Sequence, residues 1–139
     1  MDTSHLLHLY NQKLRLFQNE LNEQLKPFGL FHSQWTILYT LFQKEEMTQT
    51  EIWQYLKVEA PTITRTLVRM EKNGWVNRSI GQDKRERIVT LTNKAKSTYP
   101  EIMKQIKGTE VQFLQNLSQQ ERQQFQQLLE KLSLERGII

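Results

Sequence analysis

The sequence predicts a mainly helical α+β fold in which a short β-hairpin interrupts a series of amphipathic helices. Apolar residues recur at three- and four-residue steps along most of the chain, which is typical of helices that bury one face. Strand-like runs occur in residues 75–92, where WVNRSI and RIVTLT are separated by the polar segment GQDKRE. The predicted order is therefore four helices, a hairpin and two further helices.

Length and composition limit the class of protein. At 139 residues the chain can form one domain with a real core, but not two ordinary domains. No apolar run approaches the roughly 20 residues of a membrane helix, and the N-terminus lacks a signal-peptide layout. We therefore expect a cytoplasmic protein without a membrane partner. Cysteine is absent, which excludes disulfides, thiolate metal sites and thiol redox sensing.

The first helices follow from apolar spacing and capping residues. A stripe through Leu7, Tyr10, Leu14, Phe17 and Leu21 predicts a helix that stops near Pro27 and Gly29. A second helix is expected after Ser33 as N-cap, with Trp35, Leu38, Tyr39 and Phe42 facing inward.

Two short helices then follow in close succession. Thr48 and Glu51 form a capping-box pattern ahead of a short helix that ends near Leu56. The next helix is predicted to begin near Pro61 and to end at Gly74. Only residues 57–60 separate the two, which is the spacing of a helix-turn-helix.

Two long helices are expected after the hairpin. Thr92 is a plausible cap for a helix that runs to about Leu117, and Ser118 with Glu121 is another capping box. The last helix is expected to bury Phe125, Leu128, Leu129 and Leu132. The apolar faces of the first and last helices are larger than a single small domain can cover, which indicates an interface.

The excess positive charge of the chain lies in one segment. Residues 60–90 contain seven Lys and Arg against three Asp and Glu, while the remainder has twelve of each sign. This +4 segment covers the second helix of the helix-turn-helix and the hairpin. Localised positive charge on a helix followed by a ribbon is what duplex DNA attracts.

The helix after the turn has the pattern of a DNA-reading element. Ile63, Leu67 and Met70 fall on one face and are predicted to be buried, while the opposite face is polar and cationic. Small groups at its start permit close approach to base edges, and Arg65 can grip guanine O6 and N7. An ordinary solvent-exposed helix with scattered cations would show the same pattern. The basic hairpin that follows favours the interpretation as a DNA-binding helix. The predicted DNA-binding residues are Thr48, Gln49, Ala60, Pro61, Thr62, Thr64, Arg65, Arg69, Arg78, Lys84, Arg85 and Arg87.

The hairpin tip, residues 82–87, is too hydrophilic to pack on protein. Basic ribbon tips can follow the minor groove, where narrow A·T tracts attract arginine. Asp83 lies two residues from Arg85 and is expected to orient its guanidinium by a charge-assisted hydrogen bond.

These residues resemble a known family. The run DKRERIVTLT is similar to the wing signature D-x-R-x-x-x-V-x-L-T of the MarR family, matched at Asp83, Arg85, Val89, Leu91 and Thr92. The preceding APTITRTLVRMEKNGWV resembles the recognition helix of that family. Ala95 stands where the family often has glycine, which favours an uninterrupted helix.

The resemblance implies a winged helix-turn-helix regulator with N- and C-terminal helices that form a dimerisation domain. It divides the single domain 1–139 into a DNA-binding part, 33–92, and a dimerisation part, 1–30 with 93–139. It further implies a homodimer, more often a repressor than an activator, on a pseudo-palindromic duplex. A small-molecule effector, if one exists, would bind between the two parts, where His32, Trp35 and Tyr39 are expected; plain core packing is the alternative for these side chains.

Other functions find little support in the sequence. His5, His8 and His32 have no acidic or Cys cluster beside them, so we expect no metal site and no cofactor. No nucleophile triad or phosphate-binding glycine loop is present, so an enzyme is not expected. A winged-helix adaptor whose basic wing meets an acidic protein remains the alternative to a DNA-binding regulator.

Overall fold

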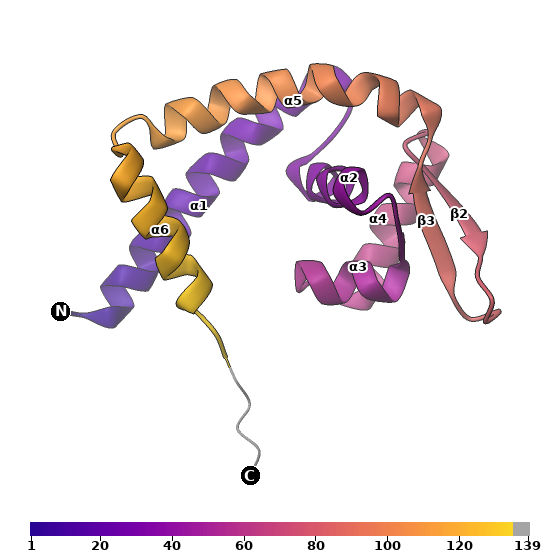
Figure 1. Cartoon of the computed structure of the whole chain (residues 1–139), viewed down its shortest axis with the longest axis horizontal. Coiled ribbons are helices and arrows are strands. Elements are labelled where there is room, and N and C mark those ends of the chain that lie inside the picture. Colours follow the sequence, from indigo (N-terminus) through magenta and orange to yellow (C-terminus); the bar gives the residue numbers. More distant parts are fainter. Residues whose placement is uncertain (135–139) are drawn as a thin grey trace, which may run out of the picture.

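The computed structural model describes residues 1–134 of the chain, which form an arch of helices with a small sheet at one end (Figure 1). The elements in this part of the chain are α1 (Thr3–Leu25), a 3-10 turn (Lys26–Phe28), α2 (His32–Lys44), β1 (Glu46–Thr48), α3 (Gln49–Leu56), α4 (Ala60–Lys72), β2 (Val76–Ile80), β3 (Arg87–Leu91), α5 (Asn93–Leu114) and α6 (Gln119–Lys131).

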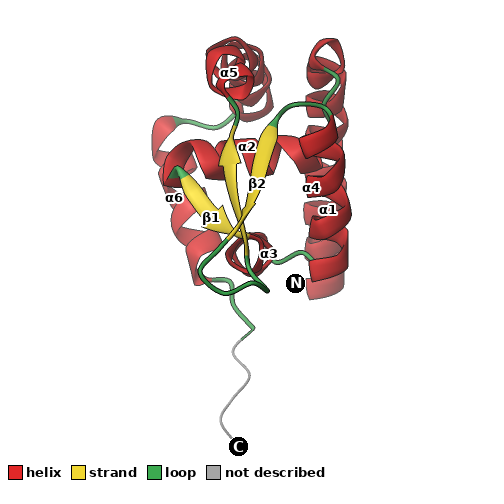
Figure 2. Cartoon of the chain, turned by 90° about the vertical axis from the view of Figure 1, so that its right-hand side faces the viewer, coloured by secondary structure: helices red, strands yellow, loops and turns green. Residues whose placement is uncertain are grey.

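The arch has a compact end and an open end. Helices α2, α3 and α4 pack beside the sheet at one end, and α5 runs across the top to α1 and α6 at the other (Figure 1). The sheet is antiparallel with the order β1-β3-β2, and Figure 2 shows it face-on. Met47 pairs with Val89, and Arg78 pairs with the same residue from the other side. The α+β class with a hairpin between helices is confirmed.

The main core lies at the compact end. Apolar side chains from every element except α6 meet there, and twelve of the largest are almost fully inaccessible. These are Leu25, Leu30, Ile37, Leu38, Leu41, Ile52, Leu67, Met70, Val76, Val89, Ile102 and Ile106. Buried residues of α5 belong to this core, so the helix that spans the arch is packed against the compact end.

Three predicted helix caps are confirmed. The Thr48 hydroxyl accepts a hydrogen bond from the Glu51 backbone N–H at 3.1 Å, and the Glu51 carboxylate accepts from the Thr48 N–H at 3.0 Å. Ser118 and Glu121 form the same reciprocal pair at the start of α6. The Thr92 hydroxyl accepts from the Ala95 N–H at 3.1 Å at the start of α5. Each cap uses backbone donors that have no partner within the helix.

Several predicted boundaries need correction. Ser33 is not the N-cap of α2, because the helix already begins at His32 and Phe31 takes the cap position. Phenylalanine cannot accept a hydrogen bond, and Asn22 of α1 supplies the acceptor for the His32 N–H at 2.8 Å. Helix α5 ends at Leu114, three residues before the predicted end. The strand β1 was not predicted, because three residues between two helices give no readable alternation.

Helix α6 does not bury its apolar side chains within one protomer. Phe125, Leu128, Leu129 and Leu132 remain 36–66% exposed, so their predicted burial is wrong for the single chain. Helices α1 and α6 cross in Figure 1 but stand on opposite sides in Figure 2, and neither covers the other. No element within residues 1–134 is left to cover the apolar face of α6.

Candidate nucleic-acid interface

Helix α4 presents a polar face that is anchored from behind. Ile63, Leu67 and Met70 are 0–3% exposed and fix the helix on the core, as predicted. Pro61 stands in the first turn, where its missing N–H costs no hydrogen bond. The residues predicted to meet DNA are exposed on the other side: Pro61, Thr62, Thr64, Arg65 and Arg69 are exposed, and Ala60 is half-buried. The outward face can therefore enter a groove without disturbing the core.

The turn between α3 and α4 is short and sharply defined. Lys57 ends α3 in the left-handed region, with φ of 59°. The Val58 N–H then donates to the Trp53 carbonyl at 3.2 Å, which closes the last turn of α3. Only residues 57–59 separate the two helices, and α4 packs against α3 directly afterwards. The predicted helix-turn-helix is therefore present.

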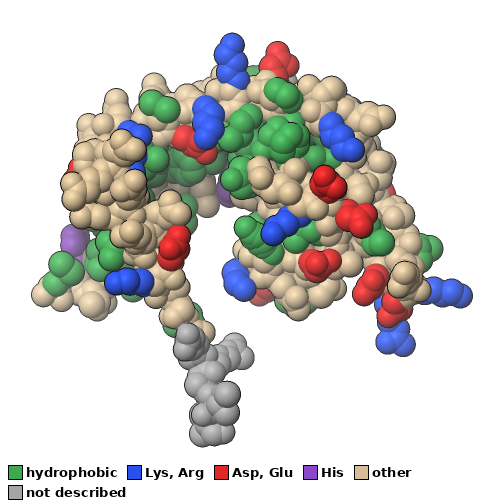
Figure 3. All heavy atoms as spheres, viewed as in Figure 1, with side chains coloured by type: hydrophobic (Ala, Val, Ile, Leu, Met, Phe, Trp, Pro, Cys, Tyr) green, Lys and Arg blue, Asp and Glu red, His purple; other side chains and the backbone are tan. Residues whose placement is uncertain are grey.

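The hairpin β2–β3 with its tip, residues 81–86, forms a projection that we call the wing. The tip is closed by backbone bonds from Gly81 N–H to the Glu86 carbonyl at 3.2 Å and from Glu86 N–H to the Asp83 carbonyl at 2.9 Å. Lys84, Arg85 and Arg87 are all exposed. Figure 3 shows Lys and Arg side chains gathered at this end of the molecule, with acidic side chains next to them.

Asp83 supports the wing differently from the prediction. Its carboxylate Oδ1 accepts a hydrogen bond from the backbone N–H of Arg85 at 3.0 Å. The ion pairs found within residues 1–134 do not include one between Asp83 and the Arg85 guanidinium. A short aspartate two residues away reaches the main chain more easily than the end of an arginine side chain. Asp83 thus shapes the backbone of the tip and leaves the Arg85 side chain open to solvent.

Arg78 has partners that the sequence did not indicate. From β2 its guanidinium donates to the Gln49 side chain of α3 at 3.0 Å and to the Glu71 carboxylate of α4 at 3.1 Å. The Arg78 side chain is only 18% exposed. Arg78 therefore connects β2, α3 and α4, whereas the other predicted cations of α4 and the wing are exposed.

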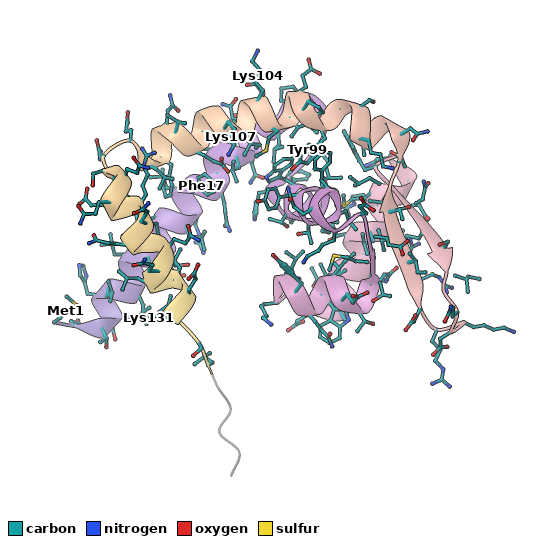
Figure 4. The ribbon with its side chains drawn as sticks, in the orientation of Figure 1. Met1, Phe17, Tyr99, Lys104, Lys107 and Lys131 are labelled. Atoms are coloured by element: carbon teal, nitrogen blue, oxygen red, sulfur yellow. The ribbon has the colours of Figure 1, made fainter. Side chains whose placement is uncertain are left out.

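The three residues predicted for an effector pocket, His32, Trp35 and Tyr39, all lie on α2. Trp35 is buried and stacks on Tyr99 with ring centroids 5.4 Å apart, and Tyr39 lies at 6.2 Å from Trp35. Figure 4 shows Tyr99 between α5 and α2. His32 is half-buried, its ring Nδ1 lies 3.2 Å from Asn22 Oδ1, and burial lowers the pKa of its imidazole. Trp35 packs on Tyr99, whereas Tyr39 remains 45% exposed, and an effector site at these residues stays a prediction.

A small cavity of about 200 Å³ lies nearby, between the start of α2 and α4. Its walls combine an aromatic ring, several hydroxyl and amide groups and two guanidinium groups. The lining residues are Phe31, Ser33, Gln34, Thr62, Arg65, Thr66 and Arg69. Two of the predicted DNA-binding cations, Arg65 and Arg69, therefore also border a cavity.

Within residues 1–134, no group of three or more His, Asp or Glu side chains is placed to hold a metal ion. In the same part of the chain, no helix has the length and apolarity that a membrane span requires.

Comparisons with known proteins agree with this architecture. A model of the MarR family matches residues 30–86, from the start of α2 to the tip of the wing. The curated relative YwoH of Bacillus subtilis (strain 168), an uncharacterized HTH-type transcriptional regulator, is 48% identical over 124 residues, which cover 89% of this chain and 90% of the relative. The chain belongs to the MarR family.

Solved MarR-family structures share nearly the whole fold. Overoxidized AbfR bound to DNA is 29% identical, with a TM-score of 0.78 over 92% of this chain and 90% of that one. A mutant MarR from E. coli complexed with operator DNA is 28% identical, with a TM-score of 0.81 over 92% and 91% of the two chains. Family membership identifies the chain as a winged-helix transcriptional regulator.

Two residues of the MarR-like segment, Gly74 and Thr92, have clear structural roles in this chain. The threonine that ends the wing signature, Thr92, donates to the Gly74 carbonyl at 2.6 Å and caps α5 at the same time. Gly74 itself has φ of 81°, which a residue with a side chain rarely adopts. The end of α4, the base of the wing and the start of α5 are thereby joined at one point.

Proposed function

We propose that this MarR-family regulator binds duplex DNA sequence-specifically, with α4 in the major groove and the wing along the adjacent minor groove. The observation that carries the proposal is the exposed face of α4 from Pro61 to Arg69, anchored by buried Ile63, Leu67 and Met70 beside an arginine-tipped wing. An anchored helix positions side chains on base edges, and exposed arginines neutralise phosphates or enter a narrow minor groove. Two of the structural relatives were solved bound to DNA, which supports duplex DNA as the partner.

We further propose that the working unit is a homodimer formed by α1, α5 and α6. Ten large apolar side chains on α1, on α6 and at the C-cap of α6 are at least 36% exposed: Leu6, Leu7, Leu9, Tyr10, Leu14, Leu16, Phe125, Leu128, Leu129 and Leu132. Contiguous apolar surface of this kind is rare on monomers and marks an interface. A second copy of the chain offers the same apolar helices, so a two-fold arrangement would cover both sets.

The dimer explains the form of the expected operator. Two recognition helices related by a two-fold axis would enter successive major grooves about 34 Å apart, and their site would read as a pseudo-palindrome. Bound in this way the protein would cover a promoter, so we propose that it acts as a repressor.

An effector would release the DNA if it bound more tightly to a dimer whose recognition helices are spaced wrongly for DNA. A ligand shifts the equilibrium between two such dimer forms by the difference in its affinity for them. We place it in the cavity beside Arg65 and Arg69 rather than at His32, Trp35 and Tyr39. The combination of two guanidinium groups with the Phe31 ring suits a small organic anion. Such a ligand would also pair with Arg65 and Arg69, which are proposed to contact the DNA.

The test of the proposed function is duplex affinity against salt concentration. Fluorescence anisotropy with selected and with scrambled duplexes should give a steep fall of log affinity with log salt for both, and tighter binding of the selected one. No binding of any duplex at low salt would contradict the proposal and would favour the alternative function, a protein-interaction adaptor. Equal binding of both duplexes would contradict sequence specificity.

A further inference from the structure

Arg78 lies at the start of a directed series of hydrogen bonds that ends on the recognition helix. Its Nη1 donates to Gln49 Oε1 at 3.0 Å, and its Nη2 bonds Glu71 Oε1 at 3.1 Å. The Nε atom is buried and has no hydrogen-bond partner within residues 1–134. The guanidinium is therefore held by its two terminal contacts, one on α3 and one on α4.

The orientation of the Gln49 amide follows from the chemistry of its neighbours. Arginine carries only donors, so the Gln49 atom that faces it must be the carbonyl oxygen. At the other side, Thr64 donates its single hydroxyl hydrogen to the Ala60 carbonyl at 3.1 Å. Thr64 can then only accept from Gln49 Nε2, which lies 3.4 Å away. Both neighbours require the same orientation of the amide.

This orientation leaves Gln49 with one free hydrogen-bonding function. Its oxygen is occupied by Arg78, and one amide hydrogen is directed at Thr64. The second amide hydrogen has no acceptor within residues 1–134. Gln49 is half-buried in the first turn of α3, beside exposed Thr64 on the DNA-facing side of α4.

A donor-only glutamine distinguishes bases in a particular way. A free glutamine pairs with adenine through both its oxygen and its nitrogen. With the oxygen withdrawn, only the donor remains, and it fits edges that carry acceptors in the major groove. Guanine offers O6 and N7 and thymine offers O4 without an amino donor beside them, whereas adenine offers N7 next to its N6 amino donor, which a donor-only glutamine cannot pair, and cytosine offers only an amino donor.

We propose that Arg78 is a positioning residue for base recognition: it takes the Gln49 oxygen and thereby makes Gln49 a donor that selects guanine or thymine at one position of each operator half-site. The inference rests on the proposed sequence-specific binding of DNA. Arg78 thus contributes to base recognition by orienting Gln49, and it does not itself contact a phosphate.

The experiment is selection of bound duplexes from a random pool by the full-length wild type and four variants. Arg78→Met keeps a long side chain but removes the donors. Gln49→Glu replaces the outward donor by an acceptor and keeps a bond to Arg78. Glu71→Gln weakens the tie between α4 and β2 without touching the Arg78–Gln49 contact. Gln54→Glu, exposed on the same helix α3, is the control for added negative charge.

The wild type should prefer guanine or thymine at one position per half-site, on the order of threefold to tenfold over the other bases. Arg78→Met should lose that preference at that position alone. Gln49→Glu should shift it toward cytosine or adenine, whose amino groups donate. Glu71→Gln should keep the wild-type preference, and Gln54→Glu should lower affinity for all sequences alike.

Each outcome bears on one of the two proposals. If the wild type selects no sequence, the proposed function fails. If the wild type selects a site but Arg78→Met and Gln49→Glu keep its base preferences, the inference fails while the function stands. A loss in Glu71→Gln equal to that in Arg78→Met would mean that Arg78 acts by joining α4 to β2, which also overturns it. Should Arg78→Met not fold, judged by thermal unfolding, the base preference of Gln49→Glu decides.

Discussion

Replacing Thr92 by alanine should destabilise the protein, because this side chain serves two elements. Its hydroxyl accepts from the Ala95 N–H as the N-cap of α5 and donates to the Gly74 carbonyl at 2.6 Å. Loss of an N-cap costs about 0.5–2 kcal/mol, and loss of a hydrogen bond to a carbonyl that stays partly buried costs about 1 kcal/mol. We expect the free energy of unfolding to fall by about 2 kcal/mol in total.

The assay is thermal unfolding followed by circular dichroism at one fixed protein concentration, because association adds to the apparent stability. For a chain of this size, about 2 kcal/mol corresponds to a decrease in Tm of roughly 7 °C. Thr92→Ser keeps the hydroxyl and should restore most of the loss. Ser97→Ala, which removes a hydroxyl that only returns to the Lys94 carbonyl of the same helix, should change Tm little. A Tm for Thr92→Ala within about 2 °C of the wild type would refute the reasoning.

Four further predictions concern the interface, the dimer and pH. Arg65→Ala should weaken operator binding by about 1–3 kcal/mol and relax base specificity, measured by anisotropy on single-base operator variants; an unchanged specificity would exclude a base contact. Arg85→Ala should weaken binding most on duplexes with A·T-rich flanks, and equal losses on G·C-rich flanks would argue against a minor-groove role. Leu128→Glu, at a side chain 61% exposed in the protomer, should give monomers in sedimentation experiments, whereas exposed Gln124→Glu on the same helix should stay dimeric. Burial lowers the pKa of His32, so as pH falls the unfolded chain takes up this proton before the folded chain does. The free energy of unfolding should therefore decrease below about pH 6.5, and it should decrease less in His32→Asn. Identical pH profiles of the two proteins would contradict this.

The sequence predicted those features that depend on neighbours along the chain. The caps at Thr48, Thr92 and Ser118 each need only a hydroxyl and a backbone N–H three residues on. The buried face of α4 needs only the helical period. In both cases the interacting groups lie within one or two turns, so the residue spacing is sufficient evidence.

The features that were missed depend on contacts between distant segments. Asn22 caps α2 from ten residues away, and Arg78 meets Gln49 across 29 residues. Strand β1 exists only because β3 offers it a partner. The sequence correctly indicated an apolar face on α6, but no surface in the described part of the same protomer buries that face. Spacing within the chain cannot indicate such pairs, because the fold brings them together.

The aromatic residues of α2 illustrate the same limit at the candidate effector site. Trp35 and Tyr39 have the helical spacing of either a pocket wall or a packed core, and the choice depends on Tyr99 and Phe42. Tyr99 stacks on Phe42 with centroids 3.8 Å apart and on Trp35 at 5.4 Å. Trp35 is packed in the core while Tyr39 stays 45% exposed, and a cavity also lies beside the arginines of α4.

The most direct test of the central claim is the stoichiometry of binding to a selected duplex and to each of its halves. We predict that two copies of the chain bind one duplex whose half-sites are centred about 34 Å apart, and that a half-site alone binds much more weakly. Analytical ultracentrifugation of the protein with labelled duplex measures both. One copy per duplex, or equal affinity for the half-site and the full site, would contradict the account.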